Sequence, residues 1–213
     1  MPNFIRNKIV GLSEEQVKPY VYIKKDNTPY FDFNKFIPMP KELEIELSSD
    51  LMAGLDMIMK QPFDTTYVKC LHKDERHCFE LGLKALLNLI HYDYMTWYCW
   101  SYNKWGTIWN SMDYEYHDNA MYISTADKPP LPVIQKLSEV FRTEITIIYA
   151  DEFAHNDNGT ATFANGQLVC QDIPEDGTKK HMEFFNEAWC KNHPIFQNED
   201  GKWDIDRFGK NGE

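Results

Sequence analysis

Hydrophobic and polar residues alternate at the start of the chain in a way that predicts a strand and then a short helix. Residues 4–10 are apolar and β-branched, with two basic residues interleaved. Ser13, with Gln16 three positions later, forms a capping box for a helix that Pro19 must end. Residues 20–23 give a second, shorter extended run.

The middle of the chain has helical spacing instead. A helix is predicted from the capping residues 48–50 to residue 60. The strongest amphipathic helix is predicted over residues 74–90, where apolar side chains recur every three or four positions: Phe79, Leu83, Leu86, Leu87 and Ile90. In residues 91–103, Tyr94, Trp97 and Trp100 would lie near one another if this stretch is also helical.

After Gly106 the spacing changes to period two, which is typical of strands. Residues 113–117 and 120–125 predict one hairpin, and Asn165-Gly166 lies between two short runs that predict another. Residues 143–150 predict a strand between the hairpins. Helices are expected over residues 178–191 and after Pro129-Pro130, the latter with four inward side chains: Ile134, Leu137, Val140 and Phe141. Hairpins mixed with helices, without repeated βαβ units, indicate an α+β fold with a mostly antiparallel sheet.

Composition and charge narrow the classes of function. The chain has 213 residues, of which 43% are hydrophobic and 15% aromatic, so it is not intrinsically disordered. Its net charge is −11, which argues against binding nucleic acid through a broad basic face. Nine of these eleven charges lie after residue 100. This acidic surplus fits either simple solubility or a surface that competes with nucleic acid for a basic partner.

The cysteines and the apolar runs bear on the compartment. The 5 cysteines are widely spaced and contain no C-x-x-C pair. The first residues lack the apolar segment of a signal peptide, and no apolar run is long enough to cross a membrane. We therefore expect reduced thiols, a cytoplasmic location in the host cell and no membrane association.

Two groups of residues are candidates for metal chemistry. Cys70, His72, His77 and Cys78 have a spacing that points the two histidines to different sides of a helix, so no metal site is expected there. On a strand, the second group would share one face and could hold a divalent ion or an acid–base pair: Asp113, Glu115 and His117. The alternative is a polar, solvent-facing side of a strand whose tyrosines pack inward.

No familiar catalytic motif or cofactor-binding motif occurs, so neither enzymatic activity nor a cofactor is expected. The densest feature is a cluster of tryptophans: Trp97, Trp100, Trp105 and Trp109. Such a cluster could stack on bases, but Lys104 is the only basic residue near it. A packed core or a surface for a partner protein is the better interpretation.

Part of this cluster resembles a family signature. Residues 103–110, NKWGTIWN, are similar to the NWGTKW[DN] signature of the YubB ferredoxin-like domain family, which phages and plasmids encode. Residues 1–3, 31–40 (FDFNKFIPMP) and 125–130 (TADKPP) resemble further elements of that family in the same order. The resemblance covers residues 1 to about 172, apart from a poorly matching stretch. Asp127-Lys128 and Phe153 depart from the Trp-Ser and the glycine that the family carries.

The resemblance implies a ferredoxin-like antiparallel sheet with helices on one face. It places this domain at residues 1–175, with a helical insertion at about 41–100, and leaves a C-terminal helix and polar tail at 176–213. No cysteines are spaced for an iron–sulfur cluster. Gly106 is expected to allow a close backbone approach, and Trp105 and Trp109 to anchor the first hairpin on the sheet. The predicted binding residues are Trp105, Gly106, Thr107, Trp109, Asn110, Asp151, Glu152 and Phe153.

The function that fits these features is that of a non-enzymatic accessory protein of a mobile genetic element. It would bind and inhibit a host protein or ribonucleoprotein with a basic surface, such as a nucleic-acid-targeting defence effector, and so act in counter-defence. Two alternatives stay open: a regulatory protein that binds nucleic acid through its sheet, and a small metal-dependent enzyme that uses Asp113, Glu115 and His117. The sequence does not indicate an oligomeric state.

Overall fold

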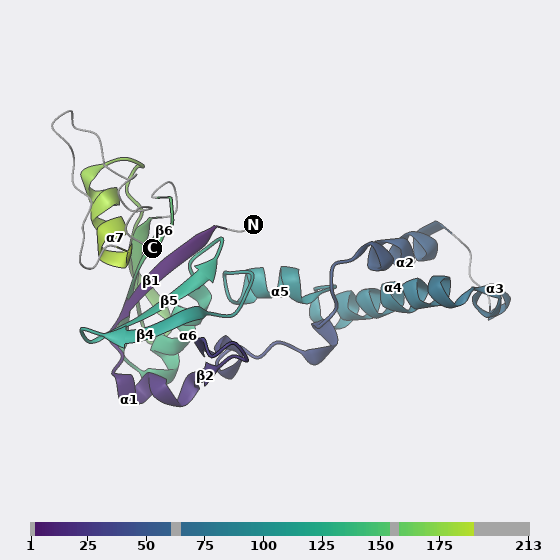
Figure 1. Cartoon of the computed structure of the whole chain (residues 1–213), viewed down its shortest axis with the longest axis horizontal. Helices are drawn as coiled ribbons and strands as arrows, with labels where there is room; N and C mark the ends of the chain where they lie inside the picture. Colours follow the sequence, from purple (N-terminus) through teal and green to yellow (C-terminus); the bar gives the residue numbers. More distant parts are fainter. Residues whose placement is uncertain (1–2, 61–64, 154–157, 190–213) are drawn as a thin grey trace. The chain divides into compact units, whose positions relative to one another are not determined.

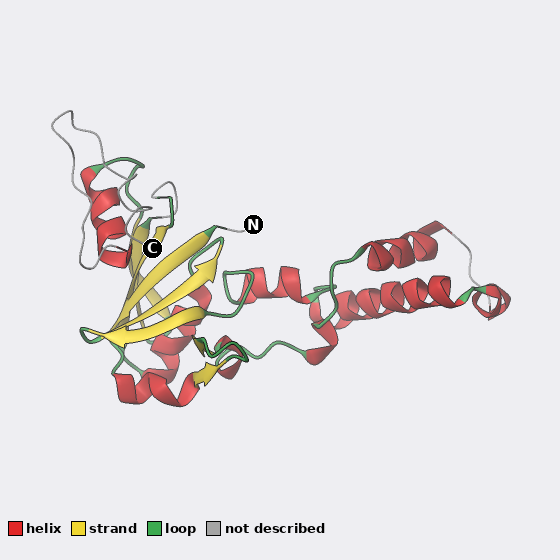
Figure 2. Cartoon of the chain, viewed as in Figure 1, coloured by secondary structure: helices red, strands yellow, loops and turns green. Residues whose placement is uncertain are grey.

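The computed structural model describes residues 3–60, 65–153 and 158–189 and has an α+β fold (Figures 1 and 2). The chain divides into two compact units. One, here called the sheet unit, comprises the residues up to Ile37 and those from Trp105 onward; the other, the helical unit, is Pro38–Lys104. No helix in the described part of the chain is both long and apolar enough to cross a membrane.

The sheet unit is built on a six-stranded antiparallel sheet with the order β4-β5-β1-β6-β7-β8. The strands are β1 (Phe4–Val10), β4 (Met112–His117), β5 (Ala120–Ala126), β6 (Glu144–Asp151), β7 (Gly159–Ala164) and β8 (Gln167–Asp172). Each predicted strand of this unit is present. The turn between β7 and β8 has positive φ at both Asn165 and Gly166, as an Asn-Gly hairpin requires.

The pattern of β1 explains why it is central. Ile5, Asn7 and Ile9 are fully buried on one face, and the residues between them are partly exposed on the other. The one polar member, Asn7, donates from its amide to the Ile5 and Ile123 carbonyls and to the Thr125 hydroxyl. The Asn7 side-chain oxygen is buried and has no hydrogen-bond partner among the described residues, so the bonds that the amide nitrogen donates offset only part of the cost of burying this side chain.

Helix α6 (Leu131–Phe141) connects β5 to the parallel strand β6, with β1 between them, so β5–α6–β6 is a split β-α-β unit. Its buried side consists of Val133, Ile134, Leu137 and Ser138. The prediction that Val140 faces inward is wrong: this side chain is 47% exposed, and Val133 takes the inward place. Val133 and Val140 are seven positions apart and so point to nearly the same side of the helix; they differ because Val140 lies in the last turn of α6, which ends at Phe141.

Helix α7 (Lys179–Trp189) lies on the other face of the sheet from α6 (Figure 1). It buries Met182 and Phe185, and Glu187 forms an ion pair of 2.8 Å with Lys8 of β1. Burial opposes the charge of the Lys8 ammonium, but the hydrogen bond and charge of Glu187 outweigh it and raise the pKa of Lys8. The sheet therefore carries α6 on one face and the C-terminal helix on the other.

A small aromatic core adjoins the sheet. It is formed by the segment that holds α1 (Glu14–Val17), η1 (Lys18–Tyr20), β2 (Val21–Ile23), β3 (Pro29–Phe31) and η2 (Phe33–Lys35). The predicted capping box at Ser13 is present. The Phe31 and Phe36 rings stack with centroids 5.4 Å apart, and Tyr20 packs on Phe36 at 4.6 Å. These ring contacts hold the segment together, and the Ser111 hydroxyl just before β4 ties it to the sheet by accepting from the Phe31 amide at 2.7 Å.

The helical unit is a pair of helices with shorter ones beside it. Its elements are η3 (Lys41–Leu43), α2 (Ser49–Lys60), α3 (Thr65–Cys70), α4 (Lys73–Tyr92) and α5 (Trp97–Lys104). Helices α2 and α4 meet at their two glycines, Gly54 and Gly82. Ile45, Leu51 and Ala85 form the buried core, with Leu55, Leu81 and Met95 packed around it. Asp93, in the left-handed conformation, ends α4, so Tyr94 is not on the helix that carries Trp97 and Trp100.

The apolar stripe that predicts α4 lies away from α2. Leu83 and Leu87 are exposed, and Ile90 is 73% exposed, whereas Gly82, Ala85 and Asn88 are buried. A face of small residues lets two helices approach closely, which a face of leucines does not allow. The helix was therefore predicted correctly, but its largest apolar side chains do not form its buried face.

Candidate binding surface

The turn at residues 105–110, here called the signature turn because it lies in the family-like signature, is held rigidly at one end of the sheet. Trp105 is buried, contacts the ring of Phe33 edge-on at 5.9 Å and donates from its indole nitrogen to the Ile37 carbonyl at 2.9 Å. Gly106 has φ +82°, and a Cβ atom there would lie 2.7 Å from the Pro132 ring. The expected close backbone approach at Gly106 is therefore confirmed, and Trp105 is a structural anchor.

Thr107 fastens the turn to the end of β5. Its buried hydroxyl donates to the Ala126 carbonyl at 2.7 Å and accepts from the Ala126 amide at 3.1 Å. In a regular sheet, a neighbouring strand would bond the amide and the carbonyl of Ala126. Here the Thr107 hydroxyl makes both of these hydrogen bonds instead. Thr107 thus continues the sheet at the point where β4 has not yet begun.

Asn110 fixes the next part of the turn. Its side-chain oxygen accepts from the amides of Phe33 and Ser111, both at 2.9 Å, and its amide nitrogen donates to Asp32 at 2.8 Å. All three contacts are made within the protein. Asn110 therefore positions the turn.

The acidic loop after β6 has a similar internal role. Asp151 is buried; one of its oxygens accepts from the Phe153 amide at 2.7 Å and the other from the Asn3 side chain at 3.2 Å. Glu152 accepts from the Phe4 amide at 2.9 Å. Both carboxylates are thus engaged with backbone or side-chain donors of the sheet unit.

The structure brings the turn and the acidic loop to the same end of the sheet. Ala126, held by Thr107, and Asp151 both lie beside the start of β1. Asn3 joins them, because its carbonyl accepts from Asp127 and its side chain donates to Asp151. Asn3 was not among the predicted binding residues; its place just before β1 in the family-like opening was the available signal.

Two of the predicted binding residues remain exposed at this end: Trp109 is 40% exposed and Phe153 is 55% exposed. Trp109 therefore does not anchor the first hairpin as fully as Trp105 does. We call Trp109, Asp127, Glu152 and Phe153 the sheet-end patch. Each of the four follows or adjoins a residue that these hydrogen bonds fix: Trp109 beside Asn110, Asp127 beside Ala126, and Glu152 and Phe153 after Asp151.

Asn158, which is not among the predicted binding residues, is fully buried. Its side-chain oxygen accepts from the Asp151 amide at 3.0 Å, and its amide nitrogen donates to the His181 carbonyl of α7 at 3.3 Å. Asn158 thus links the acidic loop to the C-terminal helix. Only the tertiary fold reveals this role, since the sequence around it looks like a surface turn.

Of the predicted group Asp113, Glu115 and His117, the last two do lie side by side, but the regular strand geometry is interrupted at Asp113. A bulge shifts the register between Met112 and Glu115, and Asp113 takes positive φ within it. Glu115 instead pairs with Arg6 at 3.1 Å and approaches His117 at 3.4 Å. These residues therefore form a polar cluster on the sheet, without the regular triad.

Burial affects one tyrosine of this edge strand. Desolvation of the Tyr114 hydroxyl, with smaller contributions from the charge of Glu14 and from Tyr116, raises the pKa of Tyr114 to about 12. Its neighbour Tyr116 donates to the Leu12 carbonyl at 2.9 Å. The tyrosines of β4 thus pack inward, as the alternation of the sequence predicts.

Cys70 ends α3, His72 precedes α4, and His77 and Cys78 lie within α4. Over the described ranges, no three His, Cys, Asp or Glu side chains are grouped so that they could hold a metal ion. Among the described residues, four cysteines are free thiols: Cys70, Cys78, Cys99 and Cys170.

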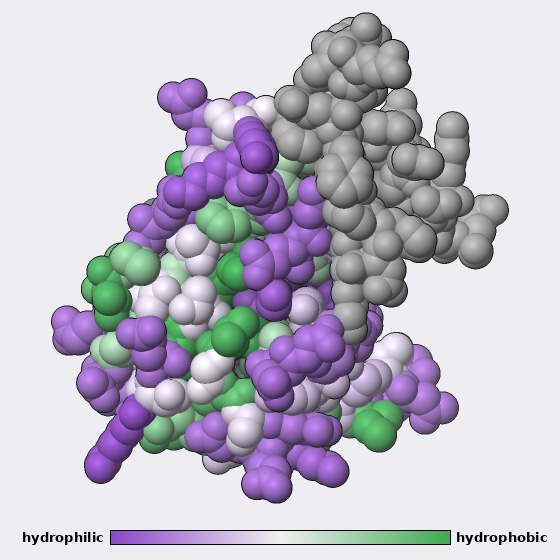
Figure 3. Space-filling model, turned by 90° about the vertical axis from the view of Figure 1, so that its left-hand side faces the viewer, coloured by the Kyte–Doolittle hydropathy of each residue, from purple (hydrophilic) through white to green (hydrophobic). Residues whose placement is uncertain are grey.

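The cations that β1 contributes to the α7 side of the sheet are already paired. Lys8 contacts Glu187, Arg6 contacts Glu115, and the Arg6 guanidinium also lies 5.7 Å from the centre of the Tyr122 ring. Figure 3 shows hydrophobic and near-neutral side chains among hydrophilic ones on the side that it presents. Such neutralised cations have little capacity to track a phosphate backbone.

The acidic surplus is likewise partly paired. Several carboxylates of the C-terminal half contact a lysine: Glu139 with Lys136, Asp172 with Lys180, Glu183 with Lys179, and Glu187 with Lys8. Within the described residues, Asp127, Glu144, Glu152 and Glu175 have no ion-pair partner. Two of these four belong to the sheet-end patch, which is therefore acidic.

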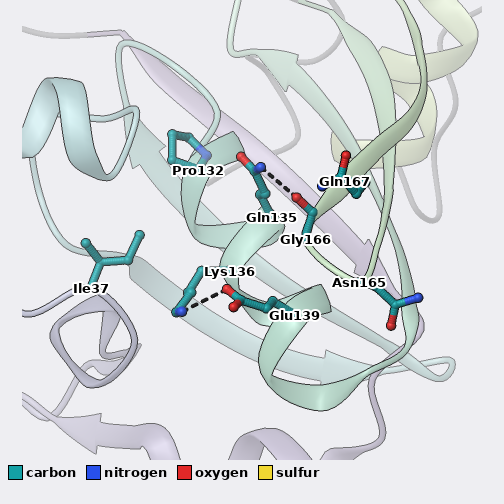
Figure 4. Close-up of a pocket in the computed structure, with 8 residues that line it drawn as sticks. All are labelled: Ile37, Pro132, Gln135, Lys136, Glu139, Asn165, Gly166 and Gln167. Atoms are coloured by element: carbon teal, nitrogen blue, oxygen red, sulfur yellow. Dashed lines mark hydrogen bonds and ion pairs between the residues drawn. The ribbon is translucent and has the colours of Figure 1, made fainter.

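A surface pocket of about 420 Å³ lies between α6 and the β7–β8 turn (Figure 4). The Gln135 amide donates to the Gly166 carbonyl at 2.7 Å across it, and Lys136 contacts Glu139 at 2.8 Å. Ile37 and Pro132 supply its apolar part. The pocket is small and open, and its polar groups mostly satisfy one another.

The sheet, its split β-α-β unit and the patch at its end define a ferredoxin-like α+β domain. Residues 104–190 match a family model described as the ferredoxin-like domain in Api92-like protein. The matching family model is named for Api92-like protein, so the resemblance of the signature to the YubB family is not confirmed. A solved structure, the crystal structure of the protein api92 from Yersinia pseudotuberculosis, is similar over 84% of this chain and 100% of its own, with 11% sequence identity and a TM-score of 0.41. No curated protein sequence matches the chain.

Proposed function

We propose that this protein is a non-enzymatic accessory protein of the phage or plasmid type, which binds a host protein or ribonucleoprotein and inhibits it. The partner class that fits best is a nucleic-acid-targeting defence effector with a basic surface. The observation that supports this proposal is the sheet-end patch, where exposed aromatic side chains and carboxylates without an ion-pair partner occur at the same end of the sheet. The proposal places the binding surface there.

The rigidity beneath the patch favours binding. Trp109 and Phe153 are exposed, while their neighbours Thr107 and Asp151 are buried and hydrogen-bonded. An aromatic side chain on a fixed backbone loses little conformational entropy when a partner covers it. Aromatic residues of this kind dominate the binding energy of many protein interfaces.

The charge of the patch suggests the chemistry of the partner. Asp127 and Glu152 have no ion-pair partner in the described part of the chain, and the net charge of the whole chain is −11. An acidic protein associates rapidly with a basic surface, and the attraction falls as salt screens it. Occupying the basic channel of a nucleic-acid-binding effector would exclude the nucleic acid itself.

The test is affinity capture from a host lysate at two salt concentrations. We expect Trp109→Ala and Phe153→Ala together to reduce the captured partner about 10-fold or more. Val140→Ala, which shortens an exposed apolar side chain on α6, is the matched control and should leave capture unchanged. Equal capture by the patch variant and the control would contradict the proposed surface.

The charge is tested separately. One variant neutralises the two acids of the sheet-end patch, Asp127→Asn and Glu152→Gln; its control neutralises two exposed acids of the helical unit, Glu44→Gln and Glu46→Gln. Both variants change the net charge equally. Loss of capture only in the first variant supports the acidic surface, and equal behaviour of the two would show that charge acts without a defined surface.

Two inexpensive assays address the alternatives. A gel-shift with nucleic acid at low salt that shows a complex would favour direct nucleic-acid binding. Metal uptake or a phenotype that is lost when Asp113, Glu115 and His117 are all replaced by Ala would favour a metal-dependent enzyme. Absence of both effects leaves the binding protein as the function to pursue.

A further inference from the structure

The two edges of the six-stranded sheet differ in chemistry. At one edge, β4 carries two carboxylates and an imidazole, Asp113, Glu115 and His117, and a bulge with positive φ. Charged side chains and bulges are the usual devices that keep an edge strand from pairing with another chain. The β4 edge is therefore protected.

The other edge, β8, has little such protection. From Gln167 to Gln171 it has no charged residue and no proline, and every one of these residues is exposed. Leu168 is 51% exposed and Val169 is 57% exposed, and apolar Ile173 follows the strand. A β-bulge at Val169 shifts the pairing with β7 by one residue, but Leu168 and Cys170 on either side stay in the ladder. An uncharged, apolar edge of this kind is a template for further strand pairing.

We propose that β8 is a homodimerisation surface, on which the β8 strand of a second copy of this chain pairs antiparallel to extend the sheet. The difference in charge between the two edges favours β8 of a second copy, rather than β4, as the strand that pairs with β8. Pairing of β8 with β4 of another copy would join unlike edges and continue without end, and the charged side chains of β4 oppose it. Pairing of β8 with β8 is self-complementary and closes after two copies.

The charges at the two ends of β8 allow such pairing. Next to its first residue, Glu139 is paired with Lys136, and at its end Asp172 is paired with Lys180. An antiparallel two-fold pair sets the beginning of one β8 beside the end of the other. Each end is already neutralised, so no unpaired like charges meet in the interface.

The size of the surface sets the strength of the dimer. A strand of 6 residues gives a short contact, and Leu168, Val169 and Ile173 add the apolar area. Such an interface falls in the class below about 1,200 Å², which is typical of weak association. The net charge of −11 on each copy also opposes the dimer, so added salt should strengthen it. This salt response has the opposite sign to that of binding to a basic partner.

The first experiment is sedimentation of the full chain over a range of concentrations, at two salt concentrations. We expect the weight-average mass to rise toward two copies and no further, and to rise more at high salt. Val169→Lys should weaken self-association about 10-fold or more, because it places a charge on the edge. Val140→Lys, the same substitution at an exposed site on α6, is the matched control and should not change it.

A second experiment uses the protein without any substitution in β8. Cys170 is exposed at the middle of β8, so a short bis-maleimide should join Cys170 to Cys170 of a second copy, identified by mass spectrometry of the linked peptide. The exposed Cys70 and Cys99 in the same chain report non-specific linking. A chain that stays monomeric at millimolar concentration, a dimer that Val169→Lys leaves intact, or linking no faster at Cys170 than at Cys70 and Cys99 would each overturn the proposal.

Discussion

Gly54 and Gly82 face each other where α2 meets α4, so closely that a Cβ atom on Gly82 would lie 2.5 Å from the carbonyl carbon of Gly54. The two backbones are in direct contact there, which only glycine permits. The helical unit has a small core, and this contact lets the helices approach each other over their whole overlap. The close approach thus determines which face of α4 is buried.

Replacing Gly82 by Ala should therefore destabilise the helical unit. In an isolated helix the same change stabilises by about 0.5–1 kcal/mol, so a loss reverses the usual sign. We expect the overlap with Gly54 to cost about 1–3 kcal/mol, measured by urea unfolding. Met59→Ala, at an exposed position of α2, is the control and should change the free energy of unfolding by less than about 0.5 kcal/mol.

The same geometry predicts how the faces of α4 respond to substitution. Ile90→Lys should change the free energy of unfolding by no more than about 0.5 kcal/mol, because the side chain is exposed. Ala85→Leu should cost about 1–3 kcal/mol, because Ala85 is fully buried in the core of the unit. The reverse ranking in thermal unfolding would show that the leucine-rich stripe is the packed face.

This contrast shows what the sequence could and could not predict. The periodicity of residues 74–90 depends on local spacing and predicted the helix correctly. Which face is buried depends on the partner helix, and here a pair of glycines outweighs the apolar stripe. The Asn165-Gly166 hairpin was predictable for the opposite reason, since its turn geometry is set by those two residues alone.

The candidate site was predictable only in part. The signature pointed to the correct turn, but most of its residues, such as Thr107 and Asn110, make internal hydrogen bonds. The link through Asn3 joins strands that are distant in the sequence, so no local pattern contains it. The regular alternation of β4 likewise gave no sign of the bulge at Asp113, which depends on pairing with β5.

Asn110 offers a direct test of the layer beneath the sheet-end patch. Asn110→Ala leaves the Phe33 and Ser111 amides without their acceptor and should cost about 1–3 kcal/mol in unfolding free energy. Asn110→Asp keeps an acceptor for both amides but sets a carboxylate against Asp32. We expect it to be destabilising at neutral pH and to recover as the pH falls and a carboxyl group is protonated. No difference between the two variants across pH would contradict this role.

The ion pair of Lys8 with Glu187 tests the attachment of α7 to β1. Its side chains are only partly buried, at 21% and 42% exposed, so solvent screens much of the interaction. A double-mutant cycle of Lys8→Met and Glu187→Gln should give a coupling energy of about 0.5–1 kcal/mol that falls with salt. The exposed pair of Lys60 with Asp56 is the control, where Lys60→Met and Asp56→Asn should give a smaller coupling. Equal coupling in the two pairs would mean that partial burial adds nothing.

The raised pKa of Tyr114 predicts a loss of stability at alkaline pH. Burial of the hydroxyl, together with Glu14 and Tyr116, raises the pKa to about 12 in the folded protein, against about 10 in an unfolded chain. Below pH 10 the tyrosine is protonated in both states, and its contribution is complete. Between pH 10 and 12 the unfolded chain loses a proton that the folded protein retains, so the free energy of unfolding falls as the pH rises.

Tyr114→Phe removes the titrating group and should flatten this decline. Urea unfolding measured at pH 7, 10 and 12 checks the prediction. The difference in unfolding free energy between the variant and the original protein should be constant below pH 10. Above pH 10 this difference should shift in favour of the variant. Parallel curves over the whole range would show that Tyr114 ionises equally in the folded and unfolded states.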